Sequence, residues 1–185
     1  MTATGPGGGV GGGVPYARHL VTRFAGSLWP GGPRRDDERW ATGWMLPGEA
    51  ALWRRMSGPD RRHAVGVARR TTGLLGPRAT RAVVAAALLH DVGKIDSHLG
   101  PVSRSLATVA GMIAGHDAAE RWRLRAGPVG RVGRYLCHDD IGAGLLELVG
   151  SDGLTIAWAR QHHLPPDRWS VPADVGAALK AADDD

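Results

Sequence analysis

The segment Leu88-Leu89-His90-Asp91-Val92-Gly93-Lys94 places an imidazole, a carboxylate and an ammonium group at the end of an apolar stretch, Ala82–Leu89. Burying a carboxylate beside an imidazole is costly unless a partner compensates for it. A divalent metal ion is a common compensation, because neutral imidazole and carboxylate are both good ligands. The glycine then allows the chain to turn, and Lys94 lies within reach of whatever the metal binds. The simpler alternative, favoured by the dipeptide alone, is a His–Asp hydrogen bond that stabilises a helix end.

Two other His-Asp pairs, His116-Asp117 and His138-Asp139, lack both the preceding apolar stretch and the following Gly-Lys. Asp117 is expected to cap a helix that begins at residue 118, and Asp139 or Asp140 to cap one that begins at residue 141. A metal-binding role for His116 is therefore the less favoured interpretation.

Further imidazoles and carboxylates stand at or near the expected ends of helices, where they could converge on His90-Asp91. His63 lies in the helix expected just before this pair, His138 closes another helix, and Asp183 ends the last apolar run. Asp184 is the nearest rival of Asp183 as a ligand.

The adjacent residues His162 and His163 close a further helix. Neighbouring side chains on a continuous helix point about 100° apart, so both can serve one site only where the helix ends. Pro165-Pro166 indicates such an end. If only one of the two is a ligand, His162 is preferred.

The elements that must position these groups are short helices, separated by Gly, Pro or Asp. No alternating strand pattern is present, so we predict an all-α fold, with the apolar helix before His90 at its centre. Residues 1–14 are expected to be a disordered glycine-rich tail, 15–45 docking or linker helices (one over Arg18–Leu28), and 46–185 the helical domain. Helices are expected over residues 36–45, 47–57, 60–75, 78–90, 101–113, 118–125, 129–137, 141–148, 155–162 and 173–182.

The cysteine count and the length of the apolar runs exclude several kinds of site and partner. The single cysteine, Cys137, excludes an intramolecular disulfide and a Cys-rich zinc site, so any metal must be held by His, Asp or Glu. It also fits a reducing cytoplasm, and the start of the chain lacks the apolar core of a signal peptide. The longest apolar run, Ala82–Leu89, is far shorter than the ~20 residues of a membrane span, so no membrane partner is expected.

The formal net charge of +5, from 23 basic and 18 acidic residues, is a modest excess spread along the chain. It favours anionic partners, for which we expect a phosphorylated small molecule or nucleotide rather than nucleic acid. The sequence leaves the oligomeric state open. Five arginines could contact phosphate, although solvated helix faces are the preferred interpretation for most of them: Arg104, Arg121, Arg125, Arg131 and Arg134.

The order His63, then His90-Asp91, then a distal Asp183 resembles the HD-domain metal-dependent phosphohydrolase superfamily. The resemblance includes the surrounding stretches RHAVGVA, AAALLHDVGK and LKAAD, and it covers roughly residues 46–185. It implies an HD-domain-like bundle of short helices in which His63, His90, Asp91 and Asp183 hold one divalent metal ion. Asp91 would bridge to a second ion where one exists.

The spacing from CHDDIGAGLLELV to RQHHLPPDRW is similar to that of the HD-GYP branch, whose members cleave cyclic di-GMP. It implies that His138, His162 and His163 supply ligands to a second metal ion. The chain lacks the Gly-Tyr-Pro signature of that branch, and Pro59 stands where the branch has a glutamate one turn before His63. These departures argue against a third ion and against cyclic di-GMP, and leave a mononuclear or dinuclear centre.

The implied chemistry is hydrolysis of a phosphate ester or diester by metal-activated water, since a divalent ion lowers the pKa of bound water from 15.7 toward about 7. Asp91 and Lys94 are the predicted catalytic residues, and Lys94 would stabilise charge on the phosphoryl oxygens. Asp96 and His98 are candidates for protonating the leaving group. His and carboxylate ligands suit Mn, Fe, Co, Ni or Zn.

Two alternatives stay open. A catalytically silent HD module could sense a ligand or dock a partner, which the glycine-rich start and the missing signature after His163 favour. A basic helical protein that binds nucleic acid would show a steep salt dependence, unaffected by alanine at His90 or Asp91.

Overall fold

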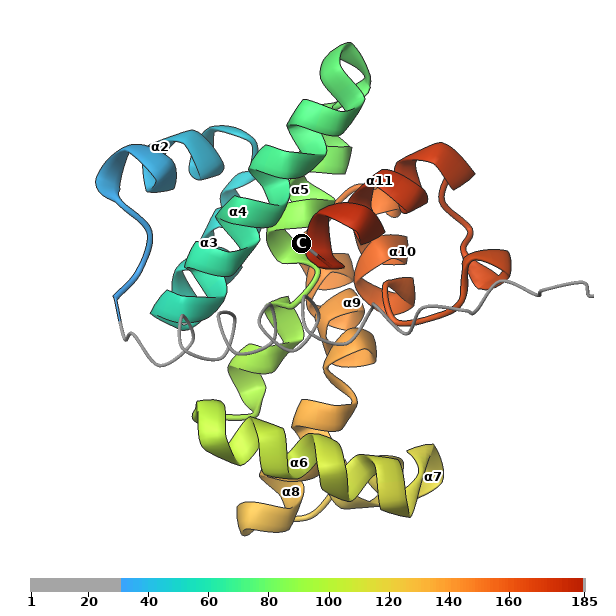
Figure 1. Ribbon diagram of the computed structural model, residues 1–185. Coiled ribbons are helices and arrows are strands. Elements are labelled where there is room, and N and C mark those ends of the chain that lie inside the picture. Colours follow the sequence, from blue (N-terminus) through green and yellow to red (C-terminus); the bar gives the residue numbers. More distant parts are fainter. Residues whose placement is uncertain (1–30, 185) are drawn as a thin grey trace, which may run out of the picture.

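The computed structural model describes residues 31–184, and this part of the chain contains ten α-helices and three short 3₁₀-helices but no strand (Figure 1). The prediction of an all-α fold is confirmed. The expected glycine-rich tail over residues 1–14 and the expected helix over Arg18–Leu28 lie outside the described residues.

The helices follow one another with short connections. The α-helices are α2 (Arg35–Gly43), α3 (Pro47–Arg55), α4 (Gly58–Leu75), α5 (Arg81–Leu89), α6 (Pro101–Ala114), α7 (His116–Arg123), α8 (Gly127–Leu136), α9 (His138–Leu148), α10 (Gly153–Gln161) and α11 (Ala173–Asp184). The 3₁₀-helices are η1 (Gly76–Arg78), η2 (Val92–Asp96) and η3 (Pro166–Arg168).

Several helix ends differ from the sequence prediction. Gly58 and Pro59 begin α4 instead of ending α3, because the Ser57 hydroxyl caps the new helix by accepting from the Asp60 amide at 3.3 Å. The helix expected over residues 78–90 is divided into η1 and the shorter α5.

The two predicted aspartate caps are wrong. Helix α7 already begins at His116, behind Gly115 with a φ of 80°, so Asp117 lies inside its first turn. Helix α9 begins at His138, and the Asp139 carboxylate accepts only from the neighbouring amide of Asp140, at 3.0 Å. Both aspartates still favour these helices, because negative charge is stabilising in a first turn.

Helix α5 forms the centre of the core, as its apolar sequence predicts. Every residue of α5 from position 83 to 89 is at most 2 % exposed, and α4 and α10 pack against it. The tryptophans Trp53 and Trp158 fill the space around it and are also fully buried. Burial of each large apolar side chain contributes about 1.5–3 kcal/mol, so α5 is a rigid support for the residues that follow it.

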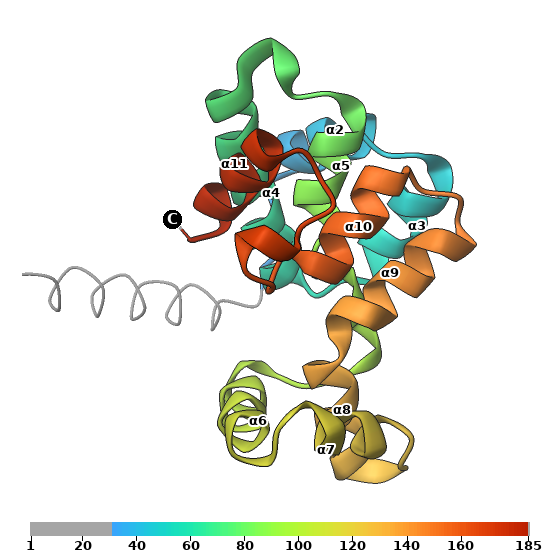
Figure 2. The same cartoon turned by 90° about the vertical axis from the view of Figure 1, so that its right-hand side faces the viewer.

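Helices α6, α7 and α8 form a separate lobe below the main helical body (Figures 1 and 2). The chain leaves the body through η2 and returns at the start of α9, so this lobe is inserted between Lys94 and His138. The part of the chain described here has no helix with the length and apolar character needed to cross a membrane.

Candidate metal centre

All seven sequence-predicted ligands lie together, although they come from five separate parts of the chain. Helix α4 supplies one, the end of α5 supplies two, and the start of α9, the end of α10 and the end of α11 supply the rest. They are His63, His90, Asp91, His138, His162, His163 and Asp183.

A first group consists of His63, His90 and Asp183, whose ligand atoms all lie within 4.8 Å of one another. The Oδ1 atom of Asp183 is 2.9 Å from Nε2 of His63 and 3.6 Å from Nε2 of His90. This group therefore offers two imidazole nitrogens and one carboxylate oxygen.

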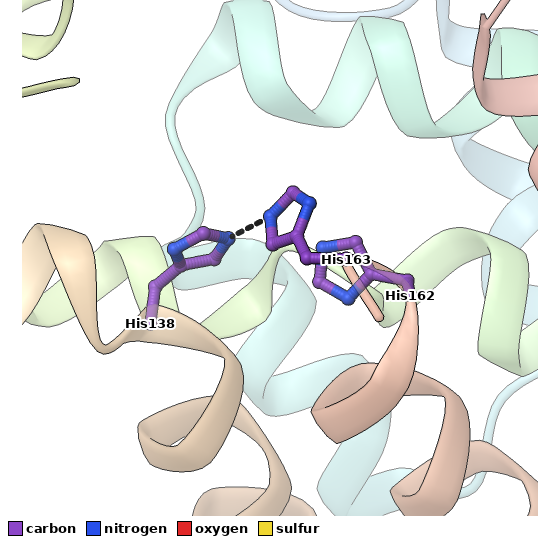
Figure 3. A group of neighbouring side chains, drawn as sticks. All are labelled: His138, His162 and His163. Atoms are coloured by element: carbon purple, nitrogen blue, oxygen red, sulfur yellow. Dashed lines mark hydrogen bonds between the residues drawn. The ribbon is translucent and has the colours of Figure 1, made fainter. Parts of the chain in front are cut away.

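A second group consists of His138, His162 and His163, whose ligand atoms also lie within 4.8 Å of one another (Figure 3). The Nε2 atoms of His138 and His163 are 3.3 Å apart. Both histidines at the end of α10 take part, because the helix stops at Gln161 and the chain turns between them.

Asp91 lies between the two groups and faces each with a different oxygen. Its Oδ2 atom is 3.5 Å from Nε2 of His90 in the first group. Its Oδ1 atom is 3.2 Å from Nε2 of His138 and 3.8 Å from Nε2 of His162 in the second group. A carboxylate in this position can bridge two ions, one held by each group.

Three of the imidazoles share one orientation, in which the ring Nδ1 lies beside the carbonyl oxygen three residues earlier. The distances from Nδ1 to that oxygen are 2.9 Å for His90, 2.8 Å for His138 and 3.0 Å for His162. A carbonyl oxygen can only accept, so Nδ1 donates and carries the proton. When such a ring is neutral, its Nε2 atom presents a lone pair to Asp91, which is how metal-binding histidines are commonly oriented.

The free-energy cost of this arrangement is clearest at His162. Its Nε2 atom is buried without a hydrogen-bond partner among the described residues, and it faces Oδ1 of Asp91. A buried polar atom without a partner costs about 1–3 kcal/mol, and two facing lone pairs repel. A cation placed between them would remove both penalties.

The donor set and its spacing fit divalent transition-metal ions. Imidazole and carboxylate ligands bind at about 2.0–2.2 Å, so ligands of one ion stand roughly 3–3.5 Å apart at tetrahedral angles. The distances between ligand atoms given above, from 2.9 to 3.8 Å, fall around that range, and all ligand atoms within each group lie within 4.8 Å of one another.

Asp91 also forms a buried ion pair with Lys94, whose Nζ lies 2.5 Å from Oδ2. Burial raises the pKa of the Asp91 carboxyl, but Lys94, His90 and His138 outweigh it and hold this pKa well below its usual range. Burial lowers the pKa of Lys94, and the adjacent Asp91 outweighs that effect and raises it. Both groups are therefore charged at neutral pH.

Asp183 is held in place from two directions. Burial raises the pKa of its carboxyl, but the hydrogen bond with His63 and the charges of His90 and His63 together outweigh burial and lower the pKa well below the usual range. Its backbone is fixed by Arg70 of α4, whose Nε donates to the carbonyl oxygen of Ala182 at 2.8 Å. The end of α11 is thereby attached to the helix that carries His63.

The metal-free protein is expected to lose stability as the pH falls from about 6.5 toward 4. Desolvation and the neighbouring His138 lower the pKa of His163 from 6.5 to about 4, and desolvation also lowers the pKa of His162 well below 6.5. The unfolded chain therefore binds protons on these rings first, and protonation favours unfolding across this range. Asp91 and Asp183 weaken the fold only at lower pH, because their pKa values lie below the usual carboxyl range.

Urea unfolding of chelator-treated protein at several pH values measures this effect. The His163→Gln variant should show a smaller loss between pH 6.5 and 4, because one of the two groups is gone. Equal slopes for the variant and the parent protein would contradict the assignment to His163.

Four residues that the sequence offered as alternatives make no described contact with the ligands. Asp184 pairs with Lys180 at 2.8 Å, and the Asp96 carboxylate lies 3.6 Å from Arg55. His98 and His116 are exposed. Of the rivals, Asp183 is therefore the residue that reaches the cluster, because it lies one position earlier on α11.

Sequence reasoning missed Asp60 and Tyr135, which lie beside the cluster. Asp60 stands one helical turn before His63, a spacing that places both on the same face of α4 and could have marked it. The Tyr135 ring stacks on His138, with ring centroids 5.8 Å apart, and the Tyr135 carbonyl orients that imidazole. Arg104 is not part of a solvated face, because both of its terminal nitrogens bind Asp60.

Comparisons of the chain with protein-family models, with curated proteins and with solved structures found no match.

Proposed function

We propose that this protein is a metal-dependent phosphohydrolase that cleaves a phosphate ester of a small molecule or nucleotide. The observation that carries the proposal is the set of imidazoles locked by their Nδ1 hydrogens so that Nε2 lone pairs face Asp91. With a buried, unpartnered Nε2 at His162, this arrangement is unfavourable without cations. We infer that the site exists to hold them.

In this proposal each group of three holds one divalent ion. His63, His90 and Asp183 would hold the first, the three histidines at positions 138, 162 and 163 the second, and Asp91 would contribute one oxygen to each. Such ions supply Lewis acidity, which polarises a phosphoryl oxygen and makes hydroxide accessible near neutral pH. The order and spacing of the ligands is the one that resembles the HD-domain superfamily, which supports the same activity. The single cysteine is in keeping with a cytoplasmic enzyme.

Lys94 has the position and charge to act on the substrate. Its side chain is 16 % exposed and its ammonium group is held beside the ligand Asp91, so it can donate to a phosphoryl oxygen at the same centre. The anionic neighbour keeps it protonated over the whole neutral range. Charge that develops on the phosphoryl oxygens would be stabilised by this fixed cation.

The Lys94→Met variant is expected to keep its metal and lose turnover. Removing one preorganised donor to a developing anion costs about 10²–10³-fold in kcat. The measurement is elemental analysis together with hydrolysis of p-nitrophenyl phosphate and bis(p-nitrophenyl) phosphate by protein loaded with Mn, Fe, Co, Ni or Zn. Lys180→Met, which removes the exposed partner of Asp184, is the matched control and should leave both readouts unchanged.

The outcomes separate the candidate functions. Metal uptake together with ester hydrolysis that Lys94→Met abolishes supports the proposal. Metal uptake without hydrolysis of either ester favours a catalytically silent module. A protein that takes up no metal contradicts the proposal.

A further inference from the structure

A buried ion pair joins the inserted lobe to the main body next to the metal centre. Arg104 of α6 contacts Asp60 of α4 with both terminal nitrogens, at 2.6 Å to Oδ1 and 2.8 Å to Oδ2. The side chains are only 18 % and 12 % exposed, and the Nε of Arg104 also donates to the carbonyl oxygen of Leu99 at 3.0 Å. This arrangement fixes the plane of the guanidinium group.

The ion pair lies near the residues of the metal centre. Asp60 is one turn from His63 of the first group. The positive charge of Lys94 helps to lower the pKa of the Asp60 carboxyl. The ring of Tyr135 stacks on His138 of the second group. The electrostatic effect of Tyr135 helps to raise the pKa of both Lys94 and Arg104. The same three side chains, Asp60, Asp91 and Tyr135, therefore interact electrostatically with both Lys94 and Arg104.

Both cations still have hydrogens to donate. A guanidinium group has five N–H hydrogens in a fixed plane, and the three bonds to Asp60 and Leu99 leave two of them. The ammonium group of Lys94 has three hydrogens and donates one to Asp91. A ligand at the centre could receive hydrogen bonds from both side chains without breaking either ion pair.

We propose that Arg104, oriented by Asp60, forms with Lys94 an anion-binding position that receives a terminal oxygen of a phosphate monoester. This inference rests on the proposed function and specifies its substrate class. A monoester has three terminal oxygens and two negative charges near neutral pH, whereas a diester has two such oxygens and one charge. Planar guanidinium groups are well suited to phosphate oxygens. A second cation beside Lys94 therefore adds most to the binding of the monoester.

A purely structural role for Arg104 makes a different prediction. If the ion pair only fastens the lobe to the body, then Asp60→Asn and Arg104→Gln should have equal effects, since each removes the same ion pair. If Arg104 binds the ligand, Asp60→Asn keeps the guanidinium group at the site and Arg104→Gln removes it. The two variants are therefore a matched pair.

The test is calorimetric titration of metal-loaded protein with inorganic phosphate and with dimethyl phosphate, at about pH 8, where phosphate is mainly a dianion. Arg104→Gln should weaken phosphate binding by about 10- to 100-fold, as loss of a charged hydrogen bond predicts. It should change the affinity for dimethyl phosphate less than about threefold. Asp60→Asn keeps the guanidinium group but loosens its orientation, so it should weaken phosphate binding clearly less than Arg104→Gln does. Metal content is measured for each variant beforehand.

Three results would overturn the inference while the proposed function stands. In the first, the metal-loaded parent protein does not bind phosphate. In the second, Arg104→Gln binds phosphate with unchanged affinity. In the third, Arg104→Gln loses as much affinity for dimethyl phosphate as for inorganic phosphate. Equal losses in Asp60→Asn and Arg104→Gln would assign the ion pair to the structural role instead. Failure of the parent protein to take up metal would instead overturn the proposed function, on which the inference rests.

Discussion

Replacing Asp91 by asparagine is expected to abolish metal binding at both positions and to reduce hydrolysis on the order of 10³-fold or more, since metal-activated water is lost. Asp91 contacts both ligand groups, with one oxygen toward His90 and the other toward His138 and His162. Asparagine keeps the volume but loses the charge, and its amide nitrogen would point N–H hydrogens at one of the two groups. No other described ligand is shared in this way.

Metal content and hydrolysis of p-nitrophenyl phosphate measure the effect, and circular dichroism confirms that the variant is folded. Asp140→Asn is the matched control, because its carboxylate is exposed and pairs with Arg160 at 3.5 Å. Asp183→Asn should lose only the ion bound with His63 and His90, and thus about half of the metal. An Asp91→Asn protein that keeps both ions would contradict the bridging role.

Replacing Gly93 by alanine is expected to destabilise the protein by ~3 kcal/mol or more, because the added methyl group overlaps backbone atoms. A Cβ at this position would lie 1.9 Å from the carbonyl oxygen of His138 and 2.6 Å from the amide nitrogen of Gly142. Backbone cannot move aside as a flexible side chain can, so η2 and α9 would have to separate. Asp91 precedes η2 and His138 begins α9, so separation would also disrupt the metal centre.

Urea unfolding of Gly93→Ala, together with its metal content, tests both consequences. Gly144→Ala is the matched control, since Gly144 lies in α9, the helix that Gly93 contacts, with no atom within 4 Å of the added Cβ. It should stabilise the protein by about 0.5–1 kcal/mol, because alanine is the better helix former. A Gly93→Ala protein with unchanged stability would show that η2 and α9 do not pack this closely.

Local signals in the sequence explain why most helices could be predicted. The apolar residues before His90 leave no polar face, so the helix that contains them has to lie in the core, and α5 does. Gly or Pro lies near the ends of most helices, but such a residue can either end one helix or begin the next. Proline is tolerated in the first turn of a helix but not in a helix interior. Because Ser57 caps α4, Pro59 lies in the first turn of that helix.

Contacts between distant residues could not be predicted. The ion pair of Arg104 with Asp60 joins residues 44 positions apart, and it forms only because the tertiary structure brings Arg104 of α6 to the start of α4. An arginine on a helix otherwise favours solvent, so its sequence neighbours carry no sign of this partner. The stacking of Tyr135 on His138 is a local contact, three residues along the chain, but it depends on how α8 ends and α9 begins.

The sequence by itself determined the all-α class, the buried position of α5 and the residue types able to hold a metal, because these depend on local propensity and apolar patterning. Only the tertiary structure decided which of these residues meet. It selected Asp183, left Asp184 with Lys180, and brought both His162 and His163 to the second group. The reason is physical: a ligand set is defined by distances of about 3 Å between helices, and those distances depend on how whole helices pack.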